Sequence, residues 1–257
     1  KYFTKLFRGK FYWALFFIAL VCIAVFSVLF HRPDGYLHIN LLRAGDESAL
    51  TVKTPDGHIL LFNPGKNINE LSTTVSRTLS PWQFKIDQVW LSSRAFAGSL
   101  SDLNDRIPVS SIILPPAVYQ SGANIRPLNL PSAIPVQKLN RGESMQFSPS
   151  LTIRTIAESN EAAAILVTYD AIAILIPAGV DYALIKETDP EALAAVDVLI
   201  LNESDISYIP PRVWESLHPQ WIMWNSTSLS PVDNWLNLEE TKIVSLISDG
   251  NGVTIEK

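Results

Sequence analysis

The residue types that most often carry metal chemistry are few and scattered in this chain. Its four histidines are His31, His38, His58 and His218. None lies near another, whereas zinc sites usually take two ligands from one short stretch of sequence. We therefore interpret each as an ordinary surface or half-buried residue rather than as a metal ligand.

Two adjacent serines, Ser92 and Ser93, are the candidates for a nucleophile. No nucleophile-elbow motif surrounds them, and no histidine is placed to act as their base. The single cysteine, Cys22, lies within an apolar segment, so no intrachain disulfide can form. The sequence thus indicates no recognisable nucleophilic site.

An apolar segment near the amino end precedes the rest of the chain. From Phe11 to Phe30 there are 20 consecutive residues without a charge, and a helix of that length rises about 30 Å, the thickness of a bilayer core. A buried core helix and a cleaved signal peptide are the alternatives. The segment is longer than a signal-peptide core and ends in bulky rather than small residues. We predict an uncleaved transmembrane helix in contact with the lipid bilayer.

Flanking charge predicts how this helix is oriented. Four basic residues precede it and only Arg32 follows closely, so the amino end should stay in the cytoplasm. We expect residues 1–32 to form a cytoplasmic basic stub with the membrane span, and residues 33–257 to form a domain outside the cytoplasm. The chain opens with Lys1, and the helix is either a single span or the last of several in a cell-membrane protein.

The charge of the globular part bears on its partners. Five of the 20 Lys and Arg residues precede residue 33, which leaves 15 against 25 Asp and Glu and a net charge near −10. Nucleic-acid binders need the opposite sign, because their affinity comes largely from neutralised phosphates. We expect no direct nucleic-acid binding and a membrane protein as partner.

Strand and helix patterns alternate after the apolar segment. The turn Thr54-Pro-Asp-Gly57 predicts a hairpin, and apolar spacing predicts a helix over Asn67–Leu79. The near-continuous apolar runs Val89–Leu91, Ile172–Ile176 and Val198–Leu201 predict strands covered on both faces. Further strands are predicted at Tyr36–Leu42, Ala49–Lys53, His58–Phe62, Met145–Phe147, Leu151–Ile156, Ile165–Tyr169, Trp221–Trp224, Ile243–Ile247 and Val253–Glu256, and further helices at Leu100–Ile107, Tyr182–Thr188, Pro190–Ala195 and Pro211–Leu217.

These elements indicate one layered α/β or α+β domain. The Pro-rich stretch from Pro108 to Pro135 is interpreted as connecting segments. The six tryptophans after residue 33 are interpreted as core residues, with an exposed aromatic recognition surface as the alternative. They are Trp82, Trp90, Trp214, Trp221, Trp224 and Trp235.

Several short segments follow one another in an order that matches a known family. They include Leu41-Leu-Arg-Ala-Gly-Asp-Glu-Ser-Ala49, Leu60-Leu-Phe-Asn-Pro-Gly65, the stretch from Asn160 to Gly179, and Ser248-Asp-Gly-Asn-Gly-Val-Thr-Ile255. In this order they resemble the carboxy-terminal metallo-β-lactamase-like domain of the ComEC family of DNA-internalisation proteins. The resemblance covers about residues 35–257 and implies a four-layer αββα sandwich that follows a membrane helix.

The resemblance implies a site for one or two metal ions. In that family the ions are held by an H-x-H-x-D-H loop together with further histidine and aspartate residues. The ions generate hydroxide near neutral pH. This chain lacks the ligand residues of that pattern, and Arg94, which lies in the matching loop, would repel a cation. We expect a vestigial site at the edge of the sandwich, without metal or other cofactor. The positions that match the family's site are Asn63, Ser92, Arg94, Gly179, Asn202 and Glu203.

Four carboxylates, Asp46, Glu47, Glu203 and Asp205, fall in or beside the matching segments. Oxygen ligands suit Ca²⁺ or Mg²⁺, but cation loops need several ligands at regular spacing, so we interpret these residues as solvated loop carboxylates. Two functions remain open. The favoured one is a non-catalytic accessory or scaffolding part of a ComEC-like DNA-internalisation (competence) system. The alternative is a membrane-anchored hydrolase or phosphodiesterase with a non-standard active site.

Overall fold

The computed structural model describes residues 13, 15–26, 33–44, 47–79, 83, 85–98, 100–119, 132–202, 205, 217–225, 235–238 and 243–255. The chain divides into two compact units, Lys1–Asp34 and Gly35–Lys257. In the first unit, residues 15–26 are helical, and large apolar side chains such as Trp13 and Phe17 are exposed by 67 % and 66 %.

The transmembrane helix predicted for Phe11–Phe30 is not supported by this structure. Within the described residues, no helix is both long enough and apolar enough to cross a membrane. Both ends of the predicted span, and His31 after it, lie outside the described residues.

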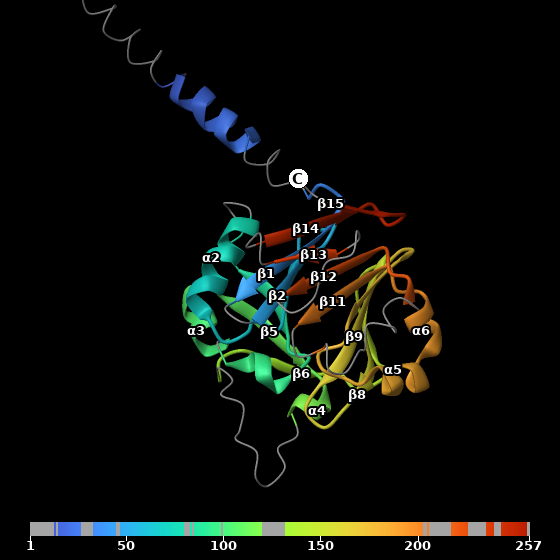
Figure 1. Cartoon of the computed structure of the whole chain (residues 1–257). Helices are drawn as coiled ribbons and strands as arrows, with labels where there is room; N and C mark the ends of the chain where they lie inside the picture. Colours follow the sequence, from blue (N-terminus) through green and yellow to red (C-terminus); the bar gives the residue numbers. More distant parts are fainter. Residues whose placement is uncertain are drawn as a thin grey trace, which may run out of the picture. The chain divides into compact units, whose positions relative to one another are not determined.

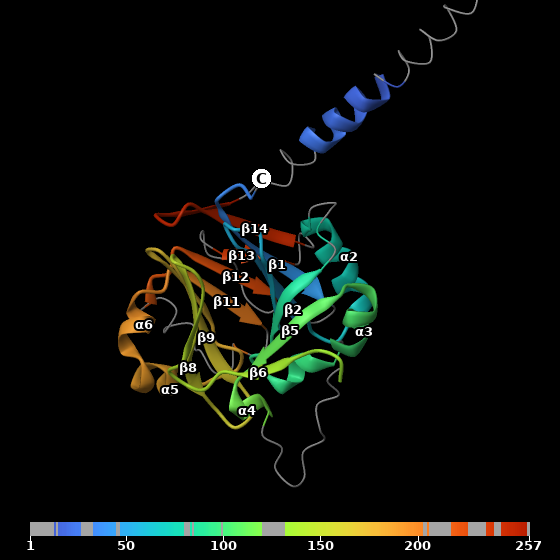
Figure 2. The same ribbon diagram turned by 180° about the vertical axis from the view of Figure 1, so that it is seen from behind.

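The second unit contains two β-sheets that face each other, with helices on their outer sides (Figures 1 and 2). Its helices are α2 (Ile68–Thr78), α3 (Leu100–Arg106), α4 (Pro116–Tyr119), α5 (Tyr182–Thr188) and α6 (Pro190–Ala194), with a 3₁₀ turn at Arg94–Ala97. In spatial order, sheet 1 consists of β15 (Val253–Ile255), β14 (Ile243–Ser248), β1 (Leu37–Ala44), β2 (Glu47–Lys53), β3 (Ile59–Phe62), β4 (Ile86–Trp90), β5 (Val109–Leu114) and β6 (Val136–Lys138). Sheet 2, also given in spatial order, consists of β13 (Trp235–Asn237), β12 (Trp221–Asn225), β11 (Val198–Asn202), β10 (Ile172–Ile176), β9 (Ala163–Tyr169), β8 (Leu151–Glu158) and β7 (Ser144–Ser148).

Each sheet has an antiparallel part and a parallel part. From β15 to β3 and from β7 to β10 the neighbouring strands pair antiparallel. From β3 to β6 and from β10 to β13 they pair parallel. A parallel pair needs a crossover connection, and α2, α3, α5 and α6 lie in such connections. The parallel strands therefore end at one edge of each sheet.

Three apolar clusters separate the four layers. The first lies between the sheets and includes Phe62, Trp90 and Ile174, none of them exposed. The second packs α2 and α3 on sheet 1, and the third packs α5 and α6 on sheet 2. The three runs predicted as strands covered on both faces are Val89–Leu91, Ile172–Ile176 and Val198–Leu201. Each is buried as predicted, and each contributes side chains to two of the clusters, one on either face of its sheet. The predicted two-sheet αββα sandwich is confirmed.

Two local predictions are also confirmed. In the hairpin between β2 and β3, the Gly57 N–H donates to the Thr54 carbonyl at 2.8 Å, and Gly57 has a φ of +88°, which glycine adopts at little cost. At the start of α2, the Asn67 side chain caps the helix by accepting from the Glu70 N–H. Leu71 and Val75 on the predicted apolar face are fully buried.

The interpretation of residues 108–135 as connecting segments is wrong in its first part. Strand β5 lies there between β4 and β6, and Ile112 and Ile113 are fully buried. Prolines at either end of this strand lie where a ladder N–H is dispensable, so they bound the strand without interrupting it. The core interpretation of tryptophan is confirmed for Trp90 and Trp224, which are at most 1 % exposed. Trp82, Trp214 and most of the helix predicted at Pro211–Leu217 lie outside the described residues.

Candidate functional site

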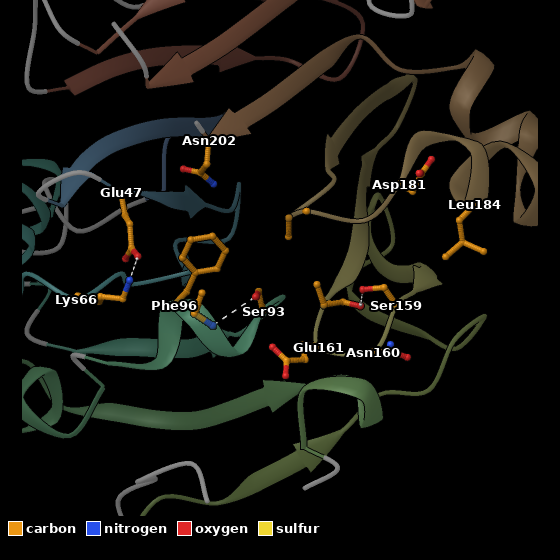
Figure 3. A pocket seen from close by; sticks show the side chains of 14 residues that line it. Glu47, Lys66, Ser93, Phe96, Ser159, Asn160, Glu161, Asp181, Leu184 and Asn202 are labelled. Carbon is orange, nitrogen blue, oxygen red and sulfur yellow. Dashed lines mark hydrogen bonds and ion pairs between the residues drawn. The ribbon is translucent and has the colours of Figure 1, made fainter. Parts of the chain in front are cut away.

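A pocket of about 660 Å³ opens at the edge where strands of both sheets end (Figure 3). Glu47 and Lys66 line one side of it, and Asp181 lies on the other. Asn202, at the end of β11, lines it as well. The carboxyl ends of parallel strands are where α/β sheets usually bind ligands. This edge is therefore the candidate functional site.

On sheet 1, the end of β3 is tied to the loop that follows β4. Asn63 is 3 % exposed and has a φ of +52°, a conformation that Asn tolerates better than most residues. Its side-chain oxygen accepts from the Ser92 N–H at 2.9 Å and from the Ser92 Oγ at 2.8 Å. The structure thus brings these two predicted site residues together, but they form hydrogen bonds with each other. The next residue, Ser93, lines the pocket instead.

On sheet 2, a buried carboxylate holds two other predicted site residues. The Asp205 side chain accepts from the Gly179 N–H at 2.5 Å and from the Asn202 N–H at 2.7 Å. Asp205 is 1 % exposed, so its interpretation as a solvated loop carboxylate is wrong. Burial raises the pKa of the Asp205 carboxyl to about 6, although the two N–H donors act to lower it.

The two sheets are joined across this edge by polar contacts. The Asn202 side-chain oxygen accepts from the N–H of Ser48 on β2 at 3.2 Å and also from the Ser48 hydroxyl. A second set of contacts lies at the same edge, and we call the two sets the polar seam. In this second set, Ser93 pairs with Ala162 as an isolated antiparallel bridge, and the Ala163 N–H donates to the Ser92 carbonyl at 2.7 Å. The loop that would hold metal in the resembling family is thus paired with the β8–β9 hairpin.

Arg94 is directed toward α4. Its Nη1 donates to the carbonyl of Val118 at 3.0 Å, while its backbone N–H donates to the carbonyl of Glu161 at 3.3 Å. Glu203, the remaining predicted site residue, lies outside the described residues, as does Asp46. Of the predicted positions, the structure therefore joins Asn63 to Ser92 and Gly179 to Asn202.

The residues present do not fit the zinc that the resemblance implies. Zinc sites use His, Cys or carboxylate ligands, whereas Asn63, Ser92 and Asn202 offer amide and hydroxyl oxygens already bonded to protein. Within the part of the chain that the structure describes, no group of three or more His, Cys, Asp and Glu could hold a metal ion. His58 is near Asp87 at 3.5 Å, on a half-exposed surface, and His218 is exposed.

Glu47 and Lys66 form an ion pair that sequence reasoning did not find. The Glu47 Oε1 and the Lys66 Nζ are 2.7 Å apart, with the side chains 18 % and 68 % exposed. The other oxygen, Oε2, is buried without a hydrogen-bond partner. A Cβ at Gly65, whose φ is +73°, would lie 3.1 Å from this Oε2. The glycine in Asn63-Pro-Gly65, which follows β3, is the one sequence signal of this close approach.

No protein-family model matches this chain, and no curated protein matches it. Solved structures are similar to it at low identity. The metallo-β-lactamase fold protein YhfI from Bacillus subtilis has a TM-score of 0.47 at 11 % identity, over 72 % of this chain and 85 % of that one. Human tRNase Z, short form, gives 0.45 at 10 % identity, over 73 % and 91 %. Zn²⁺-bound PqqB from Methylobacterium extorquens gives 0.43 at 16 % identity, over 63 % and 69 %.

Proposed function

We propose that this chain is a membrane-anchored, non-catalytic metallo-β-lactamase-like domain. In this proposal it is an accessory or scaffolding part of a ComEC-like DNA-internalisation system and acts through contacts with a membrane protein. The ordered segments between residues 35 and 257 support the family, and the two-sheet sandwich agrees with them.

The observation that carries the non-catalytic proposal is how the polar groups at the strand ends are used. Asn63 is bonded to Ser92, and Asn202 is bonded to Ser48 and Asp205. Leaving a buried polar group without its partner costs about 1–3 kcal/mol. A substrate or ion that recruited these groups would have to break several such bonds, so the arrangement favours a structural seam over a reacting centre.

The membrane anchor and the location outside the cytoplasm are part of the proposal. They are supported by the uncharged run of 20 residues from Phe11 to Phe30 and by the basic residues before it. The described helix in that run exposes Trp13, Phe17 and Ile23. A helix that is apolar on all sides needs an apolar environment such as lipid.

Metal content tests the proposal. The full chain, purified in mild detergent and incubated with equimolar zinc or manganese, should retain far less than one ion per chain after desalting. Neither metal should raise its melting temperature, because a ligand stabilises only by binding the native state.

The alternative, a hydrolase with a non-standard site, makes the opposite prediction. One retained ion per chain, with a metal-dependent rise in melting temperature that Glu203→Ala abolishes, would contradict the non-catalytic proposal. Hydrolysis of a phosphodiester in parallel with that metal binding would establish the enzyme instead.

A further inference from the structure

The hairpin between β14 and β15 contains the one Asn-Gly pair of the sequence, Asn251-Gly252. A glycine has no Cβ to shield its backbone nitrogen, so this nitrogen can attack the side-chain amide of the preceding asparagine. Asn251 is exposed, and the loop borders a hollow of about 410 Å³ lined by Asp249, Asn251 and Gly252 among others. By residue type and exposure, this pair is a candidate site for deamidation, a reaction that makes asparagine a thermolabile residue.

The deamidation reaction needs only water. The Gly252 nitrogen loses its proton and forms a bond to the Asn251 Cγ, the Cγ–Nδ2 bond breaks, and Nδ2 leaves as ammonia once it is protonated. Water then opens the resulting succinimide at either of its carbonyl groups. The product at position 251 is aspartate or isoaspartate, with one water consumed and one ammonia released.

One carboxylate holds both of the reacting groups. Asp249 Oδ1 accepts from the backbone N–H of Asn251 at 2.9 Å and from that of Gly252 at 3.2 Å. The first contact is an Asx turn, in which an aspartate side chain bonds the backbone two residues on. The pKa of the Asp249 carboxyl lies below its ordinary value because these two N–H groups, and also the Asn251 side chain, donate to it. An ionised Asp249 therefore binds the attacking nitrogen and the side chain that it would attack.

These contacts oppose the first step of the reaction in two ways. The Gly252 N–H must leave a charge-assisted hydrogen bond before its nitrogen can turn toward the Asn251 side chain. Loss of its proton would also create a negative charge beside a carboxylate, and a like charge disfavours such an ionisation. The folded loop therefore resists a reaction for which its sequence is otherwise suited.

We propose that the Asp249 carboxylate protects the Asn251-Gly252 pair from deamidation in the folded domain. Asn251 is then the residue at which the domain is modified when this contact is lost. The inference is independent of the proposed function, since it rests on the contacts that Asp249 makes within its own loop.

The protected loop positions the edge of sheet 1. Strand β15 is the edge strand and pairs with β14. The Val253 carbonyl accepts from Gln220 Nε2 at 3.1 Å and from Trp221 Nε1 at 3.2 Å, so β15 also contacts the start of β12. Isoaspartate would insert an extra methylene into the main chain two residues before Val253 and add a charge beside Asp249. Deamidation should therefore loosen this edge.

Peptide mapping by mass spectrometry measures the reaction. The full chain is incubated at pH 7.4, either folded in mild detergent or unfolded in concentrated urea, and the deamidated fraction at position 251 is followed over time. In the wild type, deamidation should be slower in the folded chain than in urea by about tenfold or more, because a charge-assisted hydrogen bond must break first. Asp249→Ala should remove most of this difference and leave the rate in urea unchanged, because the unfolded chain does not hold the contact.

Two further variants separate the contact from other effects. Asp249→Ser keeps a hydroxyl that can bond the backbone but removes the charge, so its folded rate should lie between those of the wild type and Asp249→Ala. Adding Gly252→Ala to Asp249→Ala should slow the reaction again, because the new Cβ shields the nitrogen. This Cβ meets open space, and the φ of Gly252 lies outside the left-handed region.

The matched control is Asp102→Ala, which removes an exposed carboxylate from α3 and should deamidate at the wild-type rate. Equal rates in the folded and unfolded wild type, or no acceleration by Asp249→Ala in the folded chain, would overturn the inference. The same acceleration by Asp102→Ala would also overturn it, because the effect would then come from net charge. If Asp249→Ala melts below the incubation temperature, the folded rate of Asp249→Ser decides in the same way. None of these outcomes depends on metal content, which tests the proposed function alone.

Discussion

The buried carboxyl of Asp205 should make the stability of this domain depend on pH in an unusual direction. Burial raises its pKa to about 6 in the folded chain, from an ordinary value of 3.8. Between these values the folded state binds more protons than the unfolded state, so the free energy of unfolding falls as pH rises. One pKa unit corresponds to about 1.4 kcal/mol, which gives a loss of about 2–3 kcal/mol between pH 4 and pH 7.5.

Asp205→Asn removes this titration while keeping the size of the side chain. The amide has one oxygen, so either the Gly179 or the Asn202 N–H loses its acceptor, at a cost of about 1–3 kcal/mol. The variant should therefore be less stable than the wild type at pH 4. As pH rises to 7.5, the stability of the wild type relative to the variant should fall by about 2–3 kcal/mol, which is enough to remove or reverse the difference at pH 4.

Urea unfolding of the full chain, followed by circular dichroism at pH 4, 5, 6 and 7.5, measures this difference. The control is Asp102→Asn, whose side chain is exposed. Its curve should run parallel to that of the wild type. If the gap between wild type and Asp205→Asn stays constant, or widens as pH rises, then the carboxyl does not titrate as its burial requires and the reasoning is refuted.

Two further predictions concern the site and the membrane. Gly65→Ala should destabilise the chain by about 2 kcal/mol or more in urea unfolding, because a positive φ and a contact of 3.1 Å between the new Cβ and Glu47 Oε2 act together. The control, Gly35→Ala, has a positive φ but open space around the new Cβ, so it should cost only about 1 kcal/mol. Equal costs for the two variants would contradict the close approach at Gly65. Protease added to spheroplasts should digest residues 33–257 while a tag on Lys1 stays protected; protection of the domain would reverse the predicted orientation.

Strands and turns were predictable where the sequence alone fixes the local physics. The apolar runs at Ile172–Ile176 and Val198–Leu201 can be buried on both faces only inside a layered fold, and the structure has them there. The hairpin at Thr54–Gly57 follows from its Pro and Asp-Gly residues. Strand β5 was missed because prolines flank it, and proline was read as a sign of connecting segments.

The site was predictable only in part, because its contacts join residues far apart in sequence. The Glu47–Lys66 pair spans two strands and two turns, and no local pattern indicates it. Burial of Asp205 depends on the N–H of Gly179, 26 residues earlier. From the sequence alone, a carboxylate in a loop beside hydroxyl and amide side chains is expected to be solvated. Only the hydrogen bond from the Gly179 N–H shows that Asp205 is not. Likewise, only the position of Val118 explains why Arg94 is directed toward α4.

The polar seam between Ser48 and Asn202 and between Ser93 and Ala162 shows what joins the two sheets at this edge. The Ser48–Asn202 contacts and the Ser93–Ala162 bridge connect residues of sheet 1 and its following loop with residues of sheet 2 and the β8–β9 hairpin. Neutral hydrogen-bonded groups are far less costly to bury than unpaired ligand charges. Hydrogen bonds between neutral groups therefore join the two sheets here, and they do so without placing an unpaired charge in the seam.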